Sequence, residues 1–354
     1  MKQKKQYTDP PMLRGWRLST AERQQYLKKK LLGMIYAGTS NMCDLGCIYC
    51  QTRGGKQLHN ETNLKERKKI LNQAKALGCK FVHLAGAGEP TIDPLFWHQL
   101  GYINKLGMTS VVFTHGMHID EEKAKRLYNL GSSVIVKIHS KNPELQDYFA
   151  NRKGYTKKRE NAINYFIKVG FNKETPTRLG IDVLVTKKNI KEIPEIFIWA
   201  RENNIFPEIK PILFLERASQ QEIKKMLEVK PNEIKELYYK LLEIDQKKYG
   251  YSWNPAPPYA GFSCDYYYYH LLISCQGDIK PCIGFEKKLG NIRTHTLREC
   301  WEHPFMDKIR NIKQNLKGKC GDCEEDCYGC PCRRIIRQGE DALFQTNDCF
   351  TDNM

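Results

Sequence analysis

The chain of 354 residues is strongly basic, with 57 lysine and arginine residues against 40 aspartate and glutamate residues and a formal net charge of +17. Apolar residues make up 41% and charged residues 27%, which is ordinary for a globular protein of about two domains. No stretch approaches the roughly 18 apolar residues that a membrane span needs. The first residues carry charge without an apolar segment behind them, so no secretory signal is expected. These features exclude an integral membrane protein and predict a cytoplasmic one.

The middle of the chain alternates short apolar runs with amphipathic stretches, as repeated β-strand and α-helix units do. The predicted strands cover residues 33–38, 80–84, 109–113, 133–138, 179–185 and 208–214. The predicted helices cover residues 63–77, 94–106, 120–130, 157–169 and 190–203. Six consecutive units predict a parallel α/β sheet, either an open doubly wound sheet or a partial barrel, and the pattern does not decide between them.

The character of the chain changes after the sixth predicted strand. We divide it into an N-terminal extension (1–32), the α/β region (33–215), a helical linker (216–260) and a cysteine-rich segment (261–354). A proline- and glycine-rich stretch marks the last boundary. The final segment has few long periodic patterns, so we expect bound metal rather than a large apolar core to organise it.

Fourteen cysteines in a chain without an export signal indicate metal or redox chemistry rather than a disulfide framework. Four lie between Cys43 and Cys79, and the other ten follow from Cys264 onward. Cysteines used as small buried apolar residues would be scattered along the chain. The clustering therefore predicts two separate metal-binding regions.

Cys43, Cys47 and Cys50 form a Cx₃Cx₂C motif in the loop after the first predicted strand. A zinc site needs four ligands, whereas three thiolates in one loop suit a [4Fe–4S] cluster with one iron left open. The motif resembles that of the radical S-adenosylmethionine (SAM) superfamily. The resemblance implies that the open iron binds SAM, and that the reduced cluster cleaves it to a 5′-deoxyadenosyl radical that abstracts a substrate hydrogen.

Further residues that resemble this family stand after the next strands, where a β/α barrel carries its reactive groups. The stretch Gly86-Ala87-Gly88-Glu89 is similar to the glycine-rich motif that holds the SAM amino group, with Ala87 in place of a second glycine. Thr114 and His115 resemble the family's TNG element, with His115 replacing asparagine. The resemblance thus implies that these residues bind the cofactor.

The resemblance also assigns contacts to the rest of SAM. It places Ser140 at the ribose, Arg152 at the methionine carboxylate, and Tyr49, Leu184 and Val185 around the adenine. Each residue has an ordinary structural alternative. Ser140 suits a helix N-cap, Arg152 a surface cation, and the two apolar strand residues a place in the core.

The C-terminal cysteines resemble the SPASM extension of radical SAM enzymes, which binds two auxiliary [4Fe–4S] clusters. The element Cys264-x₁₂-Gly277-x₄-Cys282 carries this resemblance, together with the later Leu-Gly-Asn-Ile segment. The resemblance implies a partial (β/α)₆ TIM-like barrel followed by a small cysteine-rich α+β SPASM-like domain. It places the nearer cluster on Cys264, Cys282 and Cys332, and the farther cluster on Cys320, Cys323, Cys327 and Cys349.

The fit to this extension is imperfect in two places. The spacing leaves a choice between Cys330 and Cys332, of which we favour Cys332 because a basic residue follows it. Related enzymes carry a further cysteine where this chain has Pro257 and Pro258, so one auxiliary cluster is expected to have three cysteines and an open or differently filled site. Cys275 and Cys330 are the candidate substitutes. Two zinc sites are the competing interpretation of the tail.

The favoured function is net oxidation, by dehydrogenation or crosslinking, of a ribosomal peptide or protein side chain. The alternative is a dehydrogenase or epimerase acting on a sugar or aminocyclitol intermediate, with Cys275 as hydrogen-atom donor. A third hypothesis is a zinc-stabilised nucleic-acid-binding protein. The predicted partners are a flavodoxin or ferredoxin as electron donor and a peptide or anionic small molecule as substrate, since the positive charge favours acidic partners. Binding to nucleic acid or membranes is not expected.

Overall fold

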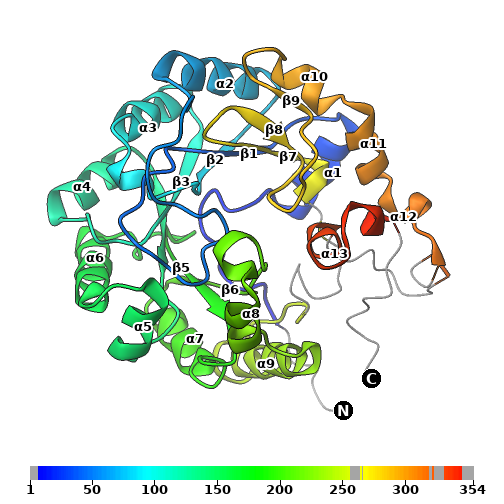
Figure 1. Ribbon diagram of the computed structural model, residues 1–354. Coiled ribbons are helices and arrows are strands. Elements are labelled where there is room, and N and C mark those ends of the chain that lie inside the picture. The colour runs from blue at the N-terminus through cyan, green and yellow to red at the C-terminus, as the bar shows by residue number, and fades with distance from the viewer. Residues whose placement is uncertain (1–6, 256–263, 265, 319–320, 323–330, 345–354) are drawn as a thin grey trace.

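A computed structural model describes residues 7–255, 264, 266–318, 321–322 and 331–344 (Figure 1). Its strands form one nine-stranded sheet in the order β6-β5-β4-β3-β2-β1-β7-β8-β9. The first six run parallel, each paired with the next: β1 (Met34–Ala37), β2 (Phe81–Leu84), β3 (Thr109–Thr114), β4 (Ser133–Lys137), β5 (Leu179–Val185) and β6 (Phe206–Pro211). This arrangement confirms the predicted partial barrel.

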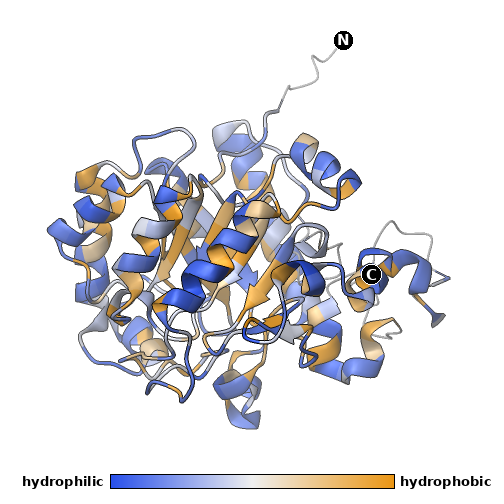
Figure 2. Cartoon of the chain, turned by 90° about the horizontal axis from the view of Figure 1, so that it is seen from above, coloured by the Kyte–Doolittle hydropathy of each residue, from blue (hydrophilic) through white to orange (hydrophobic). Residues whose placement is uncertain are grey.

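Helices between the strands cover the outer face of the curved sheet (Figure 1): α2 (Leu64–Ala76), α3 (Phe96–Lys105), α4 (Glu121–Asn129), α5 (Pro143–Ala150), α6 (Tyr155–Val169) and α7 (Ile193–Glu202). Side chains cap several of their first turns. Asn63 accepts from the Glu66 amide at the start of α2, and Asp120 accepts from the Lys123 amide at the start of α4. Figure 2 shows the apolar colour concentrated on the strands and on the helix faces turned toward them. The main core therefore lies between the sheet and these helices.

The predicted elements agree with the observed ones within three residues at each end, and β5 has the predicted bounds. Among the described residues before the linker, two helices were not predicted, α1 (Thr20–Lys28) and α5. The start of α5 carried a readable signal. The Asn142 side chain accepts hydrogen bonds from the Glu144 and Leu145 amides. Pro143 follows at the first helical position, which is the usual place of proline in a helix.

Residues of the N-terminal extension close one end of the barrel. Trp16 stacks on His83 with a ring-centroid distance of 5.3 Å and lies 6.0 Å from the ring of Phe113. The Arg14 amide donates to the Thr177 carbonyl at 2.8 Å, just before β5. This plug sits at the amino ends of the strands, so the carboxyl ends remain open for a site.

The C-terminal region continues the barrel sheet. The linker forms α8 (Gln221–Leu227) and α9 (Pro231–Ile244), after which β7 (His270–Ile273) pairs parallel with β1. β8 (Asp278–Lys280) and β9 (Gly290–Asn291) then add antiparallel strands. Gly277 turns between β7 and β8 with φ +84°, and a Cβ there would lie 2.6 Å from Ile292, which explains the glycine of the motif.

The remaining helices are α10 (Leu297–Trp301), α11 (Pro304–Arg310), α12 (Ile312–Asn315) and α13 (Pro331–Gln338). They lie beside β7–β9 in Figure 1. None of the helices in the described ranges combines the length and apolarity that crossing a bilayer requires.

Candidate functional site

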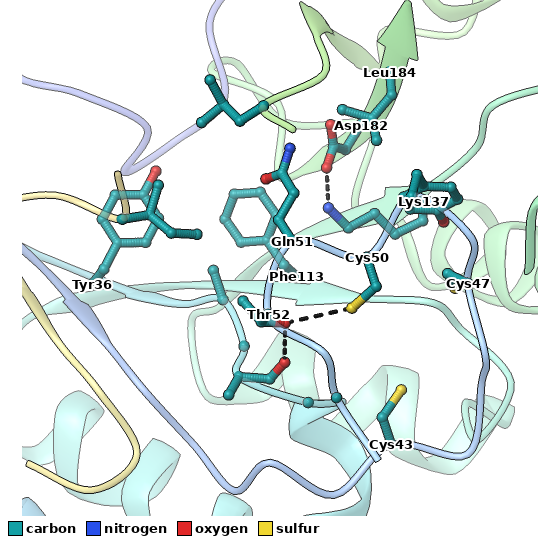
Figure 3. A pocket seen from close by; sticks show the side chains of 18 of the residues that line it. Tyr36, Cys43, Cys47, Cys50, Gln51, Thr52, Phe113, Lys137, Asp182 and Leu184 are labelled. Atoms are coloured by element: carbon teal, nitrogen blue, oxygen red, sulfur yellow. Dashed lines mark hydrogen bonds and ion pairs between the residues drawn. The ribbon is translucent and has the colours of Figure 1, made fainter. Parts of the chain in front are cut away.

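A cavity of about 240 Å³ opens at the carboxyl ends of the parallel strands. Its walls come from the loop after β1, the loop after β2, the ends of β3 to β6, and the β7–β8 region. Figure 3 shows the thiols of Cys43, Cys47 and Cys50 around one side of it and the ion pair between Lys137 and Asp182 on another. Parallel sheets place ligands at this edge.

The cysteine loop supplies three thiols to the cavity from a single short segment. Cys43, Cys47 and Cys50 all line it, and none of them forms a disulfide. The Cys43 amide donates to the Gly55 carbonyl at 2.8 Å, and a Cβ on Gly54 would lie 3.0 Å from the Cys43 Cβ. Three adjacent thiols facing a largely apolar cavity fit a [4Fe–4S] cluster with one open iron.

The glycine-rich stretch after β2 packs directly against this loop. A Cβ on Gly88 would lie 2.1 Å from the Met42 carbonyl oxygen, so no other residue fits there without a backbone shift. The Glu89 amide donates to the same oxygen at 2.7 Å. Gly86 has φ +85°, and Ala87 accepts from the Thr52 hydroxyl at 2.5 Å. The motif therefore fixes the start of the cysteine loop as well as lining the cavity.

Glu89 is buried and already holds several protein donors. Its Oε1 accepts from the Thr91 amide and hydroxyl and from the Thr114 hydroxyl, the two hydroxyls at 2.6 Å. Its Oε2 accepts from the His115 amide at 2.9 Å. A carboxylate has about four acceptor positions. Three of the bonds go to Oε1 and one goes to Oε2, so Oε2 has more room for a further donor. The contact of Glu89 with the SAM amino group stays a prediction.

His115 joins the end of β3 to the cysteine loop. Its Nε2 donates to Asp44 Oδ1 at 3.0 Å, and its Nδ1 accepts from the Met117 amide at 3.1 Å. The His118 Nε2 lies 3.0 Å from the second Asp44 oxygen. Hydrogen bonds and charge from these two imidazoles hold the pKa of Asp44 well below its usual range. The residue that replaces the family's asparagine thus tethers the loop beside Cys43.

Two predicted SAM contacts lie away from the described cavity wall. Ser140 is buried, donates to Glu192 Oε2 at 2.7 Å and accepts from the Asn142 amide at 2.9 Å. Asn142, not Ser140, caps α5. Arg152 is exposed, and neither it nor Ser140 belongs to the described lining of the cavity. The structure gives no support to these two assignments, whereas Lys137, at the end of β4, does line the cavity.

Arg159 is a buried cation that the sequence analysis missed. It lies on α6 with no exposed surface, and its Nε and Nη1 have no hydrogen-bond partner within the part of the chain that the structure describes. Its Cα approaches Gly116, after β3, and the neighbouring Tyr155 hydroxyl donates to the His115 carbonyl at 3.0 Å. Burial lowers the pKa of the guanidinium. Arg159 is not among the described lining residues of the cavity, but it packs behind His115, which is one of them, and open donors on a buried arginine are suited to an anion.

The predicted adenine residues divide between the cavity and the core. Tyr49 and Leu184 line the cavity, and the Tyr49 ring meets that of His139 edge-on at 4.3 Å. Val185 belongs to the main core and is not among the lining residues described. Successive residues of a strand point to opposite faces, so Leu184 and Val185 cannot both face the ligand.

A buried group of charges lies on the wall opposite the glycine-rich stretch. Lys137 forms an ion pair with Asp182, and Lys210 Nζ lies 3.1 Å from Asp182 and 3.4 Å from Glu208. Despite burial, the two lysines lower the pKa of Asp182, while burial raises the pKa of Glu208 to about 7. Sequence analysis missed this group, although charges inside predicted apolar strands are a signal of function.

The predicted nearer auxiliary cluster borders the same cavity. Cys282 lines it, and Cys264 and Cys332 are buried. A Cβ on Gly284 would lie 2.7 Å from the Cys332 Cβ, which places Cys332 against the segment that carries Cys282. The Tyr267 hydroxyl donates to Cys332 Sγ at 3.6 Å. These contacts suit a shared cluster on Cys282 and Cys332, and the part of Cys264 in it stays a prediction.

The other cysteines have different surroundings. Cys275 is buried at the β7–β8 turn against Gly38, outside the described cavity lining, and burial raises its pKa to about 11. Its role as a hydrogen donor has no support from this position. Cys79 and Cys300 are buried in the main core. Five predicted ligands lie outside the described residues: Cys320, Cys323, Cys327, Cys330 and Cys349.

Comparison with known proteins matches two families. Residues 38–200 match the Radical SAM superfamily, and residues 264–324 match SPASM, an iron–sulfur cluster-binding domain. The AdoMet-dependent heme synthase of Methanosarcina barkeri is 25% identical over 334 residues, covering 84% of this chain and 90% of that protein. The mycofactocin maturase MftC of Mycobacterium tuberculosis is 25% identical over 154 residues, covering 43% of this chain and 38% of that protein.

Among solved structures, Streptococcus suis SuiB bound to S-adenosylmethionine has a TM-score of 0.71 at 20% identity, covering 93% of this chain and 80% of that one. This likeness confirms the barrel with its C-terminal extension. The matched families imply SAM and [4Fe–4S] clusters as cofactors, in agreement with the cysteine loop and the cavity. The chain is therefore an enzyme of the radical SAM superfamily with a C-terminal SPASM iron–sulfur cluster-binding domain.

Proposed function

We propose that this enzyme carries out a net oxidation at an unreactive C–H bond, by dehydrogenation or crosslinking, with a ribosomal peptide or protein side chain as substrate. The observation that carries the proposal is the shared cavity. One space is lined by Cys43, Cys47 and Cys50 on one side and by Cys282 on another. A substrate in it lies between the predicted radical-generating cluster and an electron acceptor.

The roles of the chain's own residues follow from their positions. When bound, SAM and its cluster supply the one-electron chemistry that removes a hydrogen atom from a C–H bond. Cys43, Cys47 and Cys50 hold this cluster, and the Gly86–Glu89 stretch binds the SAM amino group. We assign the SAM carboxylate to Arg159 in place of Arg152, because the Arg159 guanidinium is buried with two open nitrogens. Leu184 and Tyr49 flank the adenine.

The auxiliary side of the cavity supplies the oxidising power. Cys264, Cys282 and Cys332 would hold a cluster able to accept one electron from the substrate. A second cluster on the other auxiliary cysteines would pass electrons to a carrier such as flavodoxin or ferredoxin, and such a carrier would also supply the electron that reduces the loop cluster. The high positive charge of the chain suits these acidic carriers.

The choice of a peptide rests on relatives and on the cavity wall. SuiB has also been solved with its precursor peptide SuiA, and MftC is a maturase. Apolar and aromatic side chains around the cavity suit a side chain as the reacting group: Tyr36, Phe113, Leu213, Tyr266 and Ile283. Lys137 and Lys210 suit a neighbouring anionic group.

A second candidate substrate is a tetrapyrrole carboxylate side chain. Two observations favour it over a sugar or aminocyclitol. The heme synthase of M. barkeri aligns with 84% of this chain, against 43% for MftC. The cavity also presents two ammonium groups, on Lys137 and Lys210, that suit carboxylates. The epimerase alternative loses its donor, because Cys275 lies outside the described cavity lining.

The test uses the full chain, reconstituted anaerobically with iron and sulfide and supplied with SAM and dithionite. Peptides encoded beside the gene and iron coproporphyrin are offered separately. We expect one 5′-deoxyadenosine per product, and a product two hydrogens lighter for the peptide. An unchanged product mass despite formation of 5′-deoxyadenosine would rule out oxidation. Turnover of the tetrapyrrole alone would replace the peptide by the second candidate.

A further inference from the structure

His270 stands out among the residues around the cavity because it has a buried nitrogen without a partner. It lies at the first position of β7, is 1% exposed and lines the cavity. Its Nδ1 lies 3.3 Å from the Tyr266 carbonyl oxygen. A carbonyl oxygen only accepts, so Nδ1 carries the hydrogen and Nε2 offers a lone pair. Nε2 has no hydrogen-bond partner among the residues that the structure describes.

This arrangement is the one that proteins use to prepare a histidine for a metal. A ligating imidazole almost always donates its other N–H to a carbonyl or carboxylate, which fixes the tautomer and the ring orientation. An unpartnered polar atom at this depth costs free energy unless a ligand satisfies it. His270 Nε2 therefore needs a partner that the described side chains do not provide.

The β7–β8 hairpin brings His270 and a predicted cluster ligand to one wall of the cavity. β7 and β8 pair antiparallel with Leu272 opposite Lys280 and Ile273 opposite Ile279. His270 and Cys282 each lie two residues beyond the last of these pairs, at the same end of the hairpin. Both side chains line the same cavity.

The resemblance gives the cluster that includes Cys282 three cysteine ligands, and the described lining of the cavity adds no fourth from the C-terminal region, whereas Cys330 lies outside the described residues. Cys264, Cys282 and Cys332 are its predicted ligands, and Pro257 and Pro258 stand where relatives carry another cysteine. The substitutes available from the sequence were Cys275 and Cys330. Cys275 lies against Gly38, outside the cavity lining of the described structure. Histidine is an established replacement for cysteine at iron–sulfur clusters.

We infer that His270 Nε2 is the fourth ligand of the auxiliary [4Fe–4S] cluster held by Cys264, Cys282 and Cys332. This inference rests on the auxiliary cluster that the proposed function requires. Replacing a thiolate by a neutral imidazole raises the reduction potential of a cluster. A higher potential makes the cluster beside the cavity a better acceptor for the second electron of a net oxidation.

The test looks for a histidine nitrogen bonded to an auxiliary cluster. The full chain carries Cys43→Ala, Cys47→Ala and Cys50→Ala, so that only auxiliary clusters form, and it is grown with ¹⁵N-labelled histidine. It is reconstituted without SAM, reduced with dithionite and examined by pulsed electron paramagnetic resonance. We expect about eight irons per chain and strong hyperfine coupling to a histidine nitrogen. The coupling disappears in His270→Ala and in Cys282→Ala.

Two further variants separate ligation from a general structural role. His270→Cys is expected to keep the iron content, lose the nitrogen coupling and lower the reduction potential of one cluster. His83→Ala is the matched control. His83 is equally buried, meets the same Tyr36 ring at 4.9 Å, bonds through Nε2 to the Gly15 carbonyl at 3.0 Å and likewise has one ring nitrogen, Nδ1, without a described partner, but it is not among the described lining residues of the cavity. The coupling should survive in this variant.

The outcomes distinguish this inference from the proposed function. Coupling that persists in His270→Ala overturns the inference. The inference also fails if the triple variant with His270 unchanged holds about eight irons and shows no histidine coupling. That second result would leave the fourth position of the cluster open or assign it to a cysteine such as Cys330. In both cases the oxidative function stands. A triple variant without iron removes the auxiliary clusters, and with them both the inference and the electron acceptor of the proposed function.

Discussion

The two cysteine sites on the shared cavity are built in different ways. The radical-generating site takes Cys43, Cys47 and Cys50 from eight consecutive residues in one loop. The proposed nearer auxiliary site draws Cys264, Cys282 and Cys332 from segments that span 69 residues, counted from 264 to 332. In the first site the spacing of the motif defines the proposed ligands. In the second, the approach of α13 to Gly284 brings Cys332 against the segment that carries Cys282.

The difference shows where each site depends on the rest of the fold. The loop is held from outside by hydrogen bonds and close backbone packing from the stretch after β2. The proposed auxiliary ligands come from the C-terminal region, which is tied to the barrel by the pairing of β7 with β1, by the ion pair of Arg293 with Glu66 at 2.7 Å, and by the bond from Trp301 Nε1 to the Lys30 carbonyl at 2.7 Å. The two sets of ligands come from separate segments of the chain, so damage to one site should leave the other largely intact.

The largest expected effect comes from removing the loop ligands. The triple variant Cys43→Ala, Cys47→Ala, Cys50→Ala should lose SAM cleavage completely, because no other described thiols line that side of the cavity. Iron should fall from about twelve to about eight per chain. Iron and sulfide analysis with a 5′-deoxyadenosine assay measures both. A drop to about four irons would show that the two sites fold together and would break the comparison.

Two glycine substitutions test the supports of the two sites. Gly88→Ala places a Cβ 2.1 Å from the Met42 carbonyl oxygen, and Gly284→Ala places one 2.7 Å from the Cys332 Cβ. Overpacking of this kind costs about 1–3 kcal/mol. We expect Gly88→Ala to lose the loop cluster and Gly284→Ala to lose the nearer auxiliary cluster, each read from the electron paramagnetic resonance spectrum. Gly101→Ala, with open space around its Cβ position, is the control.

Two arginine substitutions test which residue binds the SAM carboxylate. Arg159→Gln should weaken SAM binding about 10- to 100-fold, which corresponds to a lost hydrogen bond to a charged group. Arg152→Gln should change the Kd little, because Arg152 is exposed. Isothermal titration of the reconstituted enzyme with SAM gives both values. A large effect of Arg152→Gln with none for Arg159→Gln would restore the assignment made from the sequence.

The features that short sequence motifs define were predicted, whereas residues that only the folded chain brings together were missed. The strands, the cysteine loop and the glycine-rich stretch could be predicted because the residues of each one lie close together in the sequence. Arg159 was missed because a helix, not a motif, brings it beside Gly116. The proposed ligand His270 was missed because it comes near Cys282 only in the folded cavity wall, and no motif in the sequence marks it. Ser140 was assigned to the ribose without knowing that Glu192 accepts its hydroxyl hydrogen.

The raised pKa of Glu208, in the wall of the barrel, predicts that the free energy of unfolding depends on pH. Burial raises its pKa from 4.5 to about 7, so between these values the folded protein binds a proton that the unfolded chain releases. The free energy of unfolding should fall as pH rises from about 4.5 to about 7, by at most about 3 kcal/mol. Glu208→Gln should flatten this part of the curve, measured by urea unfolding. An unaltered slope in the variant would assign the dependence to another group.

The smallest expected effect compares the hydroxyl groups beside the two clusters. Tyr267 donates its hydroxyl hydrogen to Cys332 Sγ at 3.6 Å, and Thr52 Oγ1 lies at the same distance from Cys50 Sγ. The Thr52 hydrogen is already used, however, because it bonds to the Ala87 carbonyl at 2.5 Å. A thiolate carries no hydrogen and can only accept, so of these two hydroxyls only that of Tyr267 donates to a cysteine sulfur and can stabilise the reduced form of the cluster held there.

Tyr267→Phe should therefore lower the reduction potential of the auxiliary cluster, since hydrogen bonds to cysteine sulfur help set that potential. Thr52→Val should leave the potential of the loop cluster unchanged while loosening the contact with Ala87. Redox titrations followed by electron paramagnetic resonance resolve the two clusters. Equal shifts in both variants would mean that the two sites are tuned alike, and that they differ only in how the chain assembles their ligands.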